Sequence, residues 1–151
     1  MEKGAAWRDR AMQDELGREI IAAVTGNGLV GIDLSDVQIF LDGSCYTVAA
    51  KGEAAGMDCF TSATHAAVDF LRQKQPWIDD AISFLSIITG GNDMMVEDVD
   101  AVVNIIADRF KRSDYIMTAA IKNKSMMRCA RVTLVAAREA CTVSHRNSIH
   151  S

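Results

Sequence analysis

The stretch SFLSIITGGNDMMVEDVDAVVNIIADRF, residues 83–110, carries the pattern that decides the fold. Residues 83–89 are a nearly continuous apolar run, which is typical of a strand covered on both faces or nearly so. Glycine and polar residues at 90–93 predict a tight turn. Helical spacing then returns in Val99, Val102, Val103, Ile106 and Phe110. A strand that leads at once into an amphipathic helix indicates an α/β fold.

Further elements are expected on both sides of this stretch. Strands are predicted at 44–50, 114–121 and 128–136, and a long helix at 58–75. Gly52 and Gly56 are expected to bracket a loop. Toward the N-terminus, apolar residues at every fourth position predict a helix over 6–25, followed by a short helix for which Asp33 or Ser35 is a candidate N-cap.

The predicted order is a long helix, a short helix and then β-α-β-α-β-β. The strand–helix–strand units should be right-handed and mostly parallel. The last two strands, joined by a short polar hairpin loop, should be antiparallel. We therefore expect a two-layer α/β sandwich in which one mixed four-stranded sheet has helices packed on a face.

The length of 151 residues suits a single domain. We expect a long helix at 6–25, a loop at 26–36, the α/β sandwich at 37–138 and a tail at 139–151. The longest uninterrupted apolar run is five residues, Ile20–Val24, far short of a membrane span. With no apolar signal-peptide core near the N-terminus, the prediction is a cytoplasmic protein with no membrane partner.

The charge of −4 is unevenly distributed along the chain. Residues 1–108 carry 7 Lys and Arg against 18 Asp and Glu, whereas residues 109–151 carry 9 against 2. When the two halves fold together, their charges could offset one another. Alternatively, they could form a dipolar surface that stacks head to tail or steers an oppositely charged partner. No aromatic residue is interleaved with the basic cluster, so a nucleic-acid partner is not expected.

The sequence predicts no metal site and no cofactor. The cysteines at 45, 59, 129 and 141 lack metal-ligand spacing, and free thiols are the expected state in a reducing compartment. Zinc binding by these scattered cysteines and His65 is the alternative reading. No serine or cysteine has a recognisable catalytic partner, so hydrolase chemistry has no support.

Several segments, in order, resemble the C-terminal domain of the FtsZ/tubulin family, whose bacterial member is a cell-division GTPase. GLVGIDLSDV (28–37) is similar to the family's GLINVDFADV, and AAKGEAAG (49–56) to its G-x-G-x-A-x-G stretch. ITGGNDMMVEDV (88–99) resembles the family's ITGG turn and helix start, and ARVTLVA (130–136) its final strand. The resemblance extends over about residues 16–137 and implies the family's C-terminal α/β fold.

The resemblance also implies a candidate interface. In the family, a loop with the pattern N-x-D-x-x-D enters the nucleotide site of the next subunit and helps to position the attacking water. The matching residues here are Gly31, Asp33 and Asp36, with Leu34 between the two acids. Gly31 replaces the family's asparagine, which argues against fully retained catalysis. Without the resemblance, both acids could simply cap a helix and complement its dipole.

The predicted connection at 122–127 is a second candidate contact. It is basic here, where the family is often acidic or neutral. Its residues could form a solvated turn, or they could contact a partner. The candidate contact residues are Lys122, Lys124, Met126 and Arg128.

The family's nucleotide site lies in an N-terminal domain with a GGGTGTG phosphate loop, and these 151 residues contain no such loop. We therefore expect no GTPase activity of its own; at most, the chain could supply acids to a partner's site. The leading hypothesis is a stand-alone domain that docks on full-length FtsZ, caps its filaments and modulates division. The alternatives are a self-associating module whose partner is another copy of itself, and a small-ligand-binding regulatory domain.

Overall fold

The computed structural model describes residues 10–25, 28–42, 47–81 and 83–138. The elements follow one another as helices α1 to α4 and strands β1 to β5, with two short 3₁₀ turns. In chain order they are α1 (Arg10–Thr25), β1 (Gly28–Val30), α2 (Leu34–Asp42), β2 (Thr47–Ala55), α3 (Cys59–Lys74), the turn Pro76–Asp80, β3 (Ser83–Gly90), α4 (Val96–Arg109), β4 (Tyr115–Lys122), the turn Lys124–Met126 and β5 (Cys129–Ala137).

The strands form one mixed sheet in the order β1-β4-β3-β5-β2. β3 and β4 are parallel, as expected for a strand–helix–strand unit, while β5 runs antiparallel to both β3 and β2. The prediction of a mixed α/β fold is confirmed. The four-stranded layout is wrong, because β1 adds a fifth strand by pairing with β4 within the segment that was expected to be a loop.

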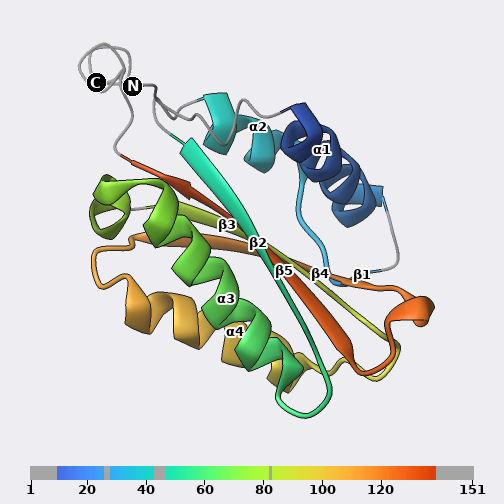
Figure 1. Cartoon of the computed structure of the whole chain (residues 1–151). Helices are drawn as coiled ribbons and strands as arrows, with labels where there is room; N and C mark the ends of the chain where they lie inside the picture. Colours follow the sequence, from blue (N-terminus) through green and yellow to red (C-terminus); the bar gives the residue numbers. More distant parts are fainter. Residues whose placement is uncertain (1–9, 26–27, 43–46, 82, 139–151) are drawn as a thin grey trace.

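The helices lie on both faces of the sheet, so the structure has three layers where two were expected. Figure 1 shows α1 and α2 above the sheet and α3 and α4 below it. The reason is visible in β3, where all but the first residue are buried and side chains alternate between the two faces. Phe84 and Ile88 belong to the core between the sheet and helices α3 and α4. Leu85 and Ile87 belong to the core between the sheet and helices α1 and α2.

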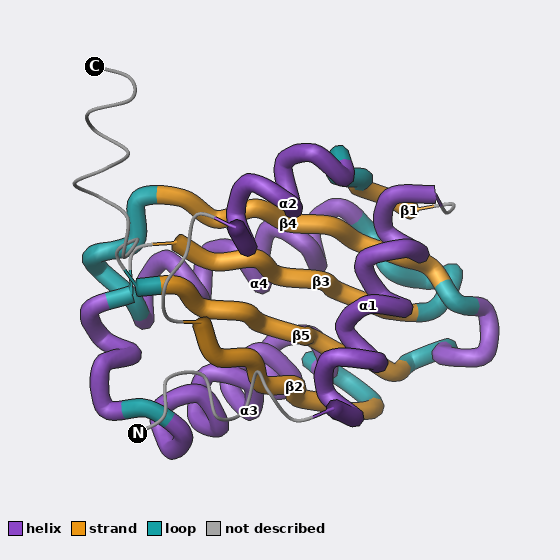
Figure 2. Tube along the Cα trace, turned by 90° about the horizontal axis from the view of Figure 1, so that it is seen from above, coloured by secondary structure: helices purple, strands orange, loops and turns teal. Residues whose placement is uncertain are grey.

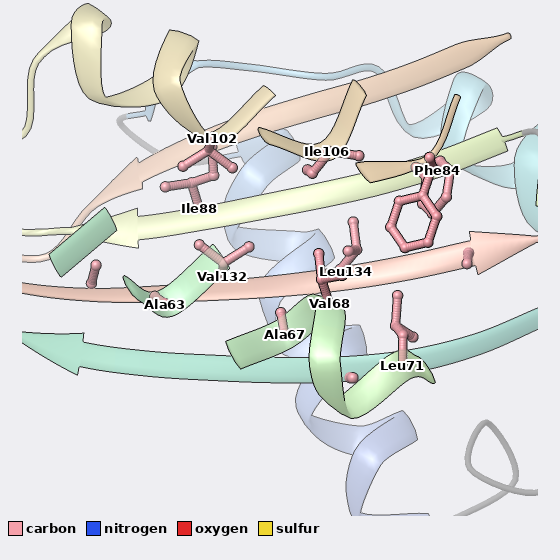
Figure 3. Packing of buried hydrophobic residues seen from close by; sticks show 14 of the residues in the cluster. Ala63, Ala67, Val68, Leu71, Phe84, Ile88, Val102, Ile106, Val132 and Leu134 are labelled. Atoms are coloured by element: carbon pink, nitrogen blue, oxygen red, sulfur yellow. The ribbon is translucent and has the colours of Figure 1, made fainter. Parts of the chain in front are cut away.

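The core on the α3/α4 side joins aliphatic residues from both helices to the centre of the sheet (Figure 3). Phe84 and Phe110 stack with ring centroids 4.7 Å apart, a contact worth about 0.5–1.5 kcal/mol beyond its buried area. Gly52 of β2 faces Ala63 and Ala67 of α3, where an added Cβ would lie 2.1 Å from the Ala63 carbonyl oxygen. This strand and this helix therefore approach closely.

The loop expected between Gly52 and Gly56 is instead the second half of β2, which extends through Ala55. Its residues pair with β5 through Ala55 opposite Cys129, and the turn begins only at Gly56, whose φ is +89°. Alternating small residues in Lys51–Ala55 lack the large side chains that usually signal a strand. The strand forms because α3 covers it and β5 supplies a complete ladder.

The connection between β4 and β5 is not a hairpin. β3 lies between these two strands, so the chain must cross the end of β3 to pass from one to the other, and it does so near Gly90 and Gly91. The Asn123 amide donates to the Gly90 carbonyl oxygen at 2.7 Å. A Cβ on Gly91 would come within 2.7 Å of the Met127 Cα, so glycine is required where the two segments cross.

The expected helix at 6–25 is seen as α1 from Arg10, and its first residues lie outside the described part, as does the tail at 139–151. None of the helices in the described ranges has the length and apolar character that a bilayer crossing needs.

Candidate functional site

The predicted interface residues lie where β1 leads into α2. β1 is held at the edge of the sheet by pairing of Gly28 with Ile121 and of Val30 with Ala120. The chain then leaves the sheet at Gly31, which is exposed, and α2 begins at Leu34. The Asp33 carbonyl oxygen accepts from the Asp36 and Val37 amides at 3.1 and 3.2 Å, which starts the helix.

Asp33 and Asp36 are both exposed on this segment. Within the described part of the chain, neither carboxylate forms an ion pair or a side-chain hydrogen bond. Both retain the favourable interaction of an acid with the N-terminal end of a helix. On the inner side of α2, Val37 and Phe40 are buried against the sheet and fix the direction of the helix. The two acids are thus exposed to solvent on a segment that Val37 and Phe40 hold against the sheet.

The four predicted contact residues of the 122–128 region do not form one cluster. Lys122 and Lys124 line a pocket of about 750 Å³ between α1 and the ends of the strands. Met126 is half-buried and lines a smaller pocket of about 390 Å³ beside β2 and β5. Arg128 lines a third pocket, of about 560 Å³, on the α3/α4 side. The four residues are close in sequence, but the segment crosses the end of the sheet, so they line three different pockets.

The largest of these pockets is predominantly basic. Its lining includes Arg18 and Glu19 from α1, and it reaches Arg131 on β5. The Arg131 guanidinium is held by Glu53 of the neighbouring strand, with Nε 2.8 Å from Oε2. The half-buried Lys122 and the exposed Lys124, together with the two arginines, make the pocket attractive to anions.

The uneven charge of the sequence is largely mixed by the fold. Arg131 from the basic half pairs with Glu53 from the acidic half, and Arg109 Nη2 lies 3.3 Å from Asp69 Oδ1. The topology explains the mixing, since β5 from the basic half lies between β3 and β2 from the acidic half. In the described residues the charges therefore offset one another across the halves.

His65 and the described cysteines show no sign of a metal centre. His65 Nδ1 lies 2.9 Å from Arg109 Nη1, and because arginine can only donate, this nitrogen is the acceptor. Cys59 and Cys129 are free thiols, and Cys45 and Cys141 lie outside the described residues. No group of three or more His, Cys, Asp or Glu side chains in the described ranges is placed to hold a metal ion.

Sequence reasoning did not bring together the exposed apolar side chains at one end of the sheet, although methionines beside two of the turns were candidate contacts. Met57 is 91% exposed, and Met95, Val96 and Met127 are all more than half exposed. They come from three different turns, so no periodicity links them. The available signal was the placement of methionines next to predicted turns at 57, 94–95 and 126–127.

Comparison with known proteins defines first the class of fold. A solved FtsZ dimer from M. jannaschii matches with a TM-score of 0.69 and 21% identity, covering 84% of this chain and 38% of that one. CetZ from Methanosaeta thermophila matches with a TM-score of 0.58 and 15% identity, covering 97% of this chain and 43% of that one. The fold is therefore of the tubulin-like class.

Curated sequences point to the same family. The cell division protein FtsZ of Bartonella bacilliformis is 28% identical over 135 residues, which cover 83% of this chain and 22% of that protein. The FtsZ of a Wolbachia species is 28% identical over 109 residues, or 72% of this chain and 27% of that protein. No family model matches the chain. In fold and in sequence the chain is therefore similar to part of the FtsZ proteins, and it spans about a quarter of the length of these curated relatives.

Proposed function

We propose that this chain acts by protein–protein association and that residues 31–36 dock on an FtsZ-type subunit. The observation that carries the proposal is the pair of exposed carboxylates, Asp33 and Asp36, which have no partner among the described residues and stand on a segment anchored by buried side chains. Exposed carboxylates that form no ion pair or side-chain hydrogen bond with the described residues are available to a partner. The resemblance of this segment to the family's interface loop supports the choice of partner.

We further propose that the chain does not hydrolyse GTP by itself. The glycine-rich phosphate loop of the family does not occur in the 151 residues, so a cradle of backbone amides for phosphate is not provided by them. Docked at the end of a filament, these 151 residues would by themselves offer no nucleotide face to the next subunit. The proposed consequence is capping of FtsZ-type filaments and modulation of division.

Co-sedimentation with GTP-assembled FtsZ tests the proposal, with phosphate release measured on the same samples. The expected result is less pelleted polymer at substoichiometric doses of the chain. Asp36→Ala should abolish this effect, because it removes an interface carboxylate without removing a buried group. Asp100→Ala is the matched control, since Asp100 is an exposed acid on α4, on the opposite face of the sheet.

The outcome that contradicts capping is an unchanged pellet with no co-pelleting of the chain and no change in phosphate release. Equal losses in Asp36→Ala and Asp100→Ala would contradict docking through residues 31–36. If phosphate release rises per subunit instead, Asp33 and Asp36 act as working acids in the partner's site.

Self-association is the second candidate function. The solved neighbours include an FtsZ dimer and a TubZ four-stranded filament, so chains with this fold associate with copies of themselves. Light scattering after size exclusion gives the mass of the chain alone. An oligomer whose size falls with added salt would favour this candidate over docking on FtsZ.

A further inference from the structure

Three connections lie at one end of the sheet, where β2 leads into α3, β3 into α4 and β4 into β5 (Figure 1). Four exposed apolar residues belong to these connections or to the first position of α4. We call this set the methionine surface: Met57, Met95, Val96 and Met127. Their exposed fractions are 91%, 59%, 53% and 52%. Methionine is flexible and polarisable, and it is over-used on surfaces that bind adaptable partners.

The three turns that carry the methionine surface are tied to one another by backbone hydrogen bonds. The Gly56 amide donates to the Arg128 carbonyl oxygen at 2.8 Å, and the Asn123 amide donates to the Gly90 carbonyl oxygen at 2.7 Å. The Met95 amide donates to Asp98 Oδ2 at 2.8 Å, which fixes the start of α4. Because these hydrogen bonds hold the turns in place, less conformational entropy is lost when a partner binds.

Backbone strain is concentrated at the same place. Asp58 and Arg128, which directly follow Met57 and Met127, have φ values of 59° and 58°. Non-glycine residues are uncommon in the left-handed region and persist there only where the surroundings enforce the conformation. The strain turns the chain immediately after each of the two methionines, so that their side chains project outward.

The surroundings of the methionine surface are acidic. Asp58 and Asp93 are exposed, and with Asp98 they line the pocket of about 560 Å³ that also includes Met57. Glu97 is exposed one residue after Val96. Among the residues described around this pocket, Arg128 is the one cation. A surface that combines apolar anchors with carboxylates selects for a positively charged partner.

We propose that the methionine surface binds a cationic amphipathic segment of a partner protein, with aliphatic side chains against the methionines and Lys or Arg against the acids. The acids would repel an anionic membrane or a nucleic acid. A second copy docked by the same surface would bring these carboxylates together, which is unfavourable. This site is separate from residues 31–36, which lie on the α1/α2 side, whereas the pocket is lined by α3 and α4.

Fluorescence anisotropy with a labelled synthetic peptide tests the proposal. The probe alternates pairs of leucine with pairs of lysine, and its two controls replace lysine by glutamate or leucine by serine. The whole chain should bind the first peptide and neither control. The double variant Met57→Gln, Met127→Gln should bind at least about tenfold more weakly, as expected for loss of apolar anchors.

A second variant and a matched control separate the charge from the apolar contribution. Asp93→Asn with Glu97→Gln should weaken binding and flatten its salt dependence. The control double variant, Phe70→Gln with Asp80→Asn, removes one exposed apolar and one acidic side chain elsewhere and should bind like the unmodified chain. Urea unfolding of each variant checks that the fold is retained.

Three results would overturn the proposal. Binding that responds to salt but not to the methionine variant would mean simple charge attraction. Equal weakening in the control variant would mean binding elsewhere. A dimer of the free chain that becomes a monomer in the methionine variant would assign the surface to a second copy. None of these results bears on Asp36, so the test is independent of docking on FtsZ.

Discussion

The environment of Cys59 changes the chemistry of its thiol. The side chain is buried at the start of α3, and burial raises its pKa above the ordinary value of 9.0, with Asp93 and Asp98 adding to the effect because their charges oppose a thiolate. The folded protein therefore keeps this proton at pH values where the unfolded chain has lost it. The stabilising contribution is complete below pH 9.0 and is lost as the pH rises through the folded pKa.

We predict that, as the pH rises above about 9, the free energy of unfolding falls more steeply in the unmodified chain than in Cys59→Ala. Urea unfolding across this range measures the difference. Because Cys59 is one of two described free thiols, Cys129→Ala is the matched control, and it should keep most of the steeper fall because Cys129 adds least to the raised pKa of Cys59. Parallel curves for all three proteins would contradict the prediction.

At the scale of residues, the sequence was a better guide to which side chains are exposed than to which of them lie together in space. The exposure of Asp33 and Asp36 beside a helix start could be expected, because acids at that position favour the helix dipole. The separation of Lys122, Met126 and Arg128 into three pockets could not, since it depends on the chain crossing the end of β3. The partition follows from tertiary topology rather than from local spacing.

At the scale of elements, the contact between β2 and α3 depends on the absence of a side chain at Gly52. An added Cβ would meet the Ala63 carbonyl oxygen at 2.1 Å and the Ala67 amide nitrogen at 2.6 Å. Both atoms are backbone, so relief requires the whole helix to move. This explains the glycine inside a strand, which would otherwise weaken it.

We predict that Gly52→Ala destabilises the fold by about 1–3 kcal/mol or more, as overpacking of a close contact does. Gly17→Ala is the matched control, because Gly17 lies inside α1 with no atom within 4 Å of an added Cβ. It should stabilise by about 0.5–1 kcal/mol through helix propensity. Urea unfolding measures both changes, and a neutral Gly52→Ala would contradict the close approach.

Element type was predictable wherever the periodicity was strong. The apolar run of β3 and the helical spacing of α4 gave both elements nearly complete. β1 was not predicted because three residues are too few to show a period. The second half of β2 was not predicted because its small residues resemble a loop. In both cases pairing with a distant strand decides the structure, and that information is not local.

At the scale of the whole molecule, the sheet interleaves the two halves of the sequence. β2 pairs only with β5 among the described strands, and β3 pairs with β4 and β5. Every strand pair thus requires a strand from the second half of the chain, as the position of β5 between β3 and β2 in Figure 2 illustrates. The same interleaving brings Arg131 to Glu53, so charge balance and sheet formation are consequences of one topology.

A chain cut after Arg112 should therefore fail to fold, although it retains β2, β3 and all four helices. Both strands would lose every described ladder partner, and the apolar faces of α3 and α4 would lose the β4 and β5 residues that they cover. In a thermal scan followed by circular dichroism, this chain should show no cooperative transition.

Mixing the 1–112 chain with a 113–151 peptide should restore part of the transition, because β4 and β5 can then insert on either side of β3. A peptide of scrambled sequence should not. A cooperative transition in the 1–112 chain alone would mean that the first half contains a fold of its own, and that the interleaved sheet does not hold the molecule together.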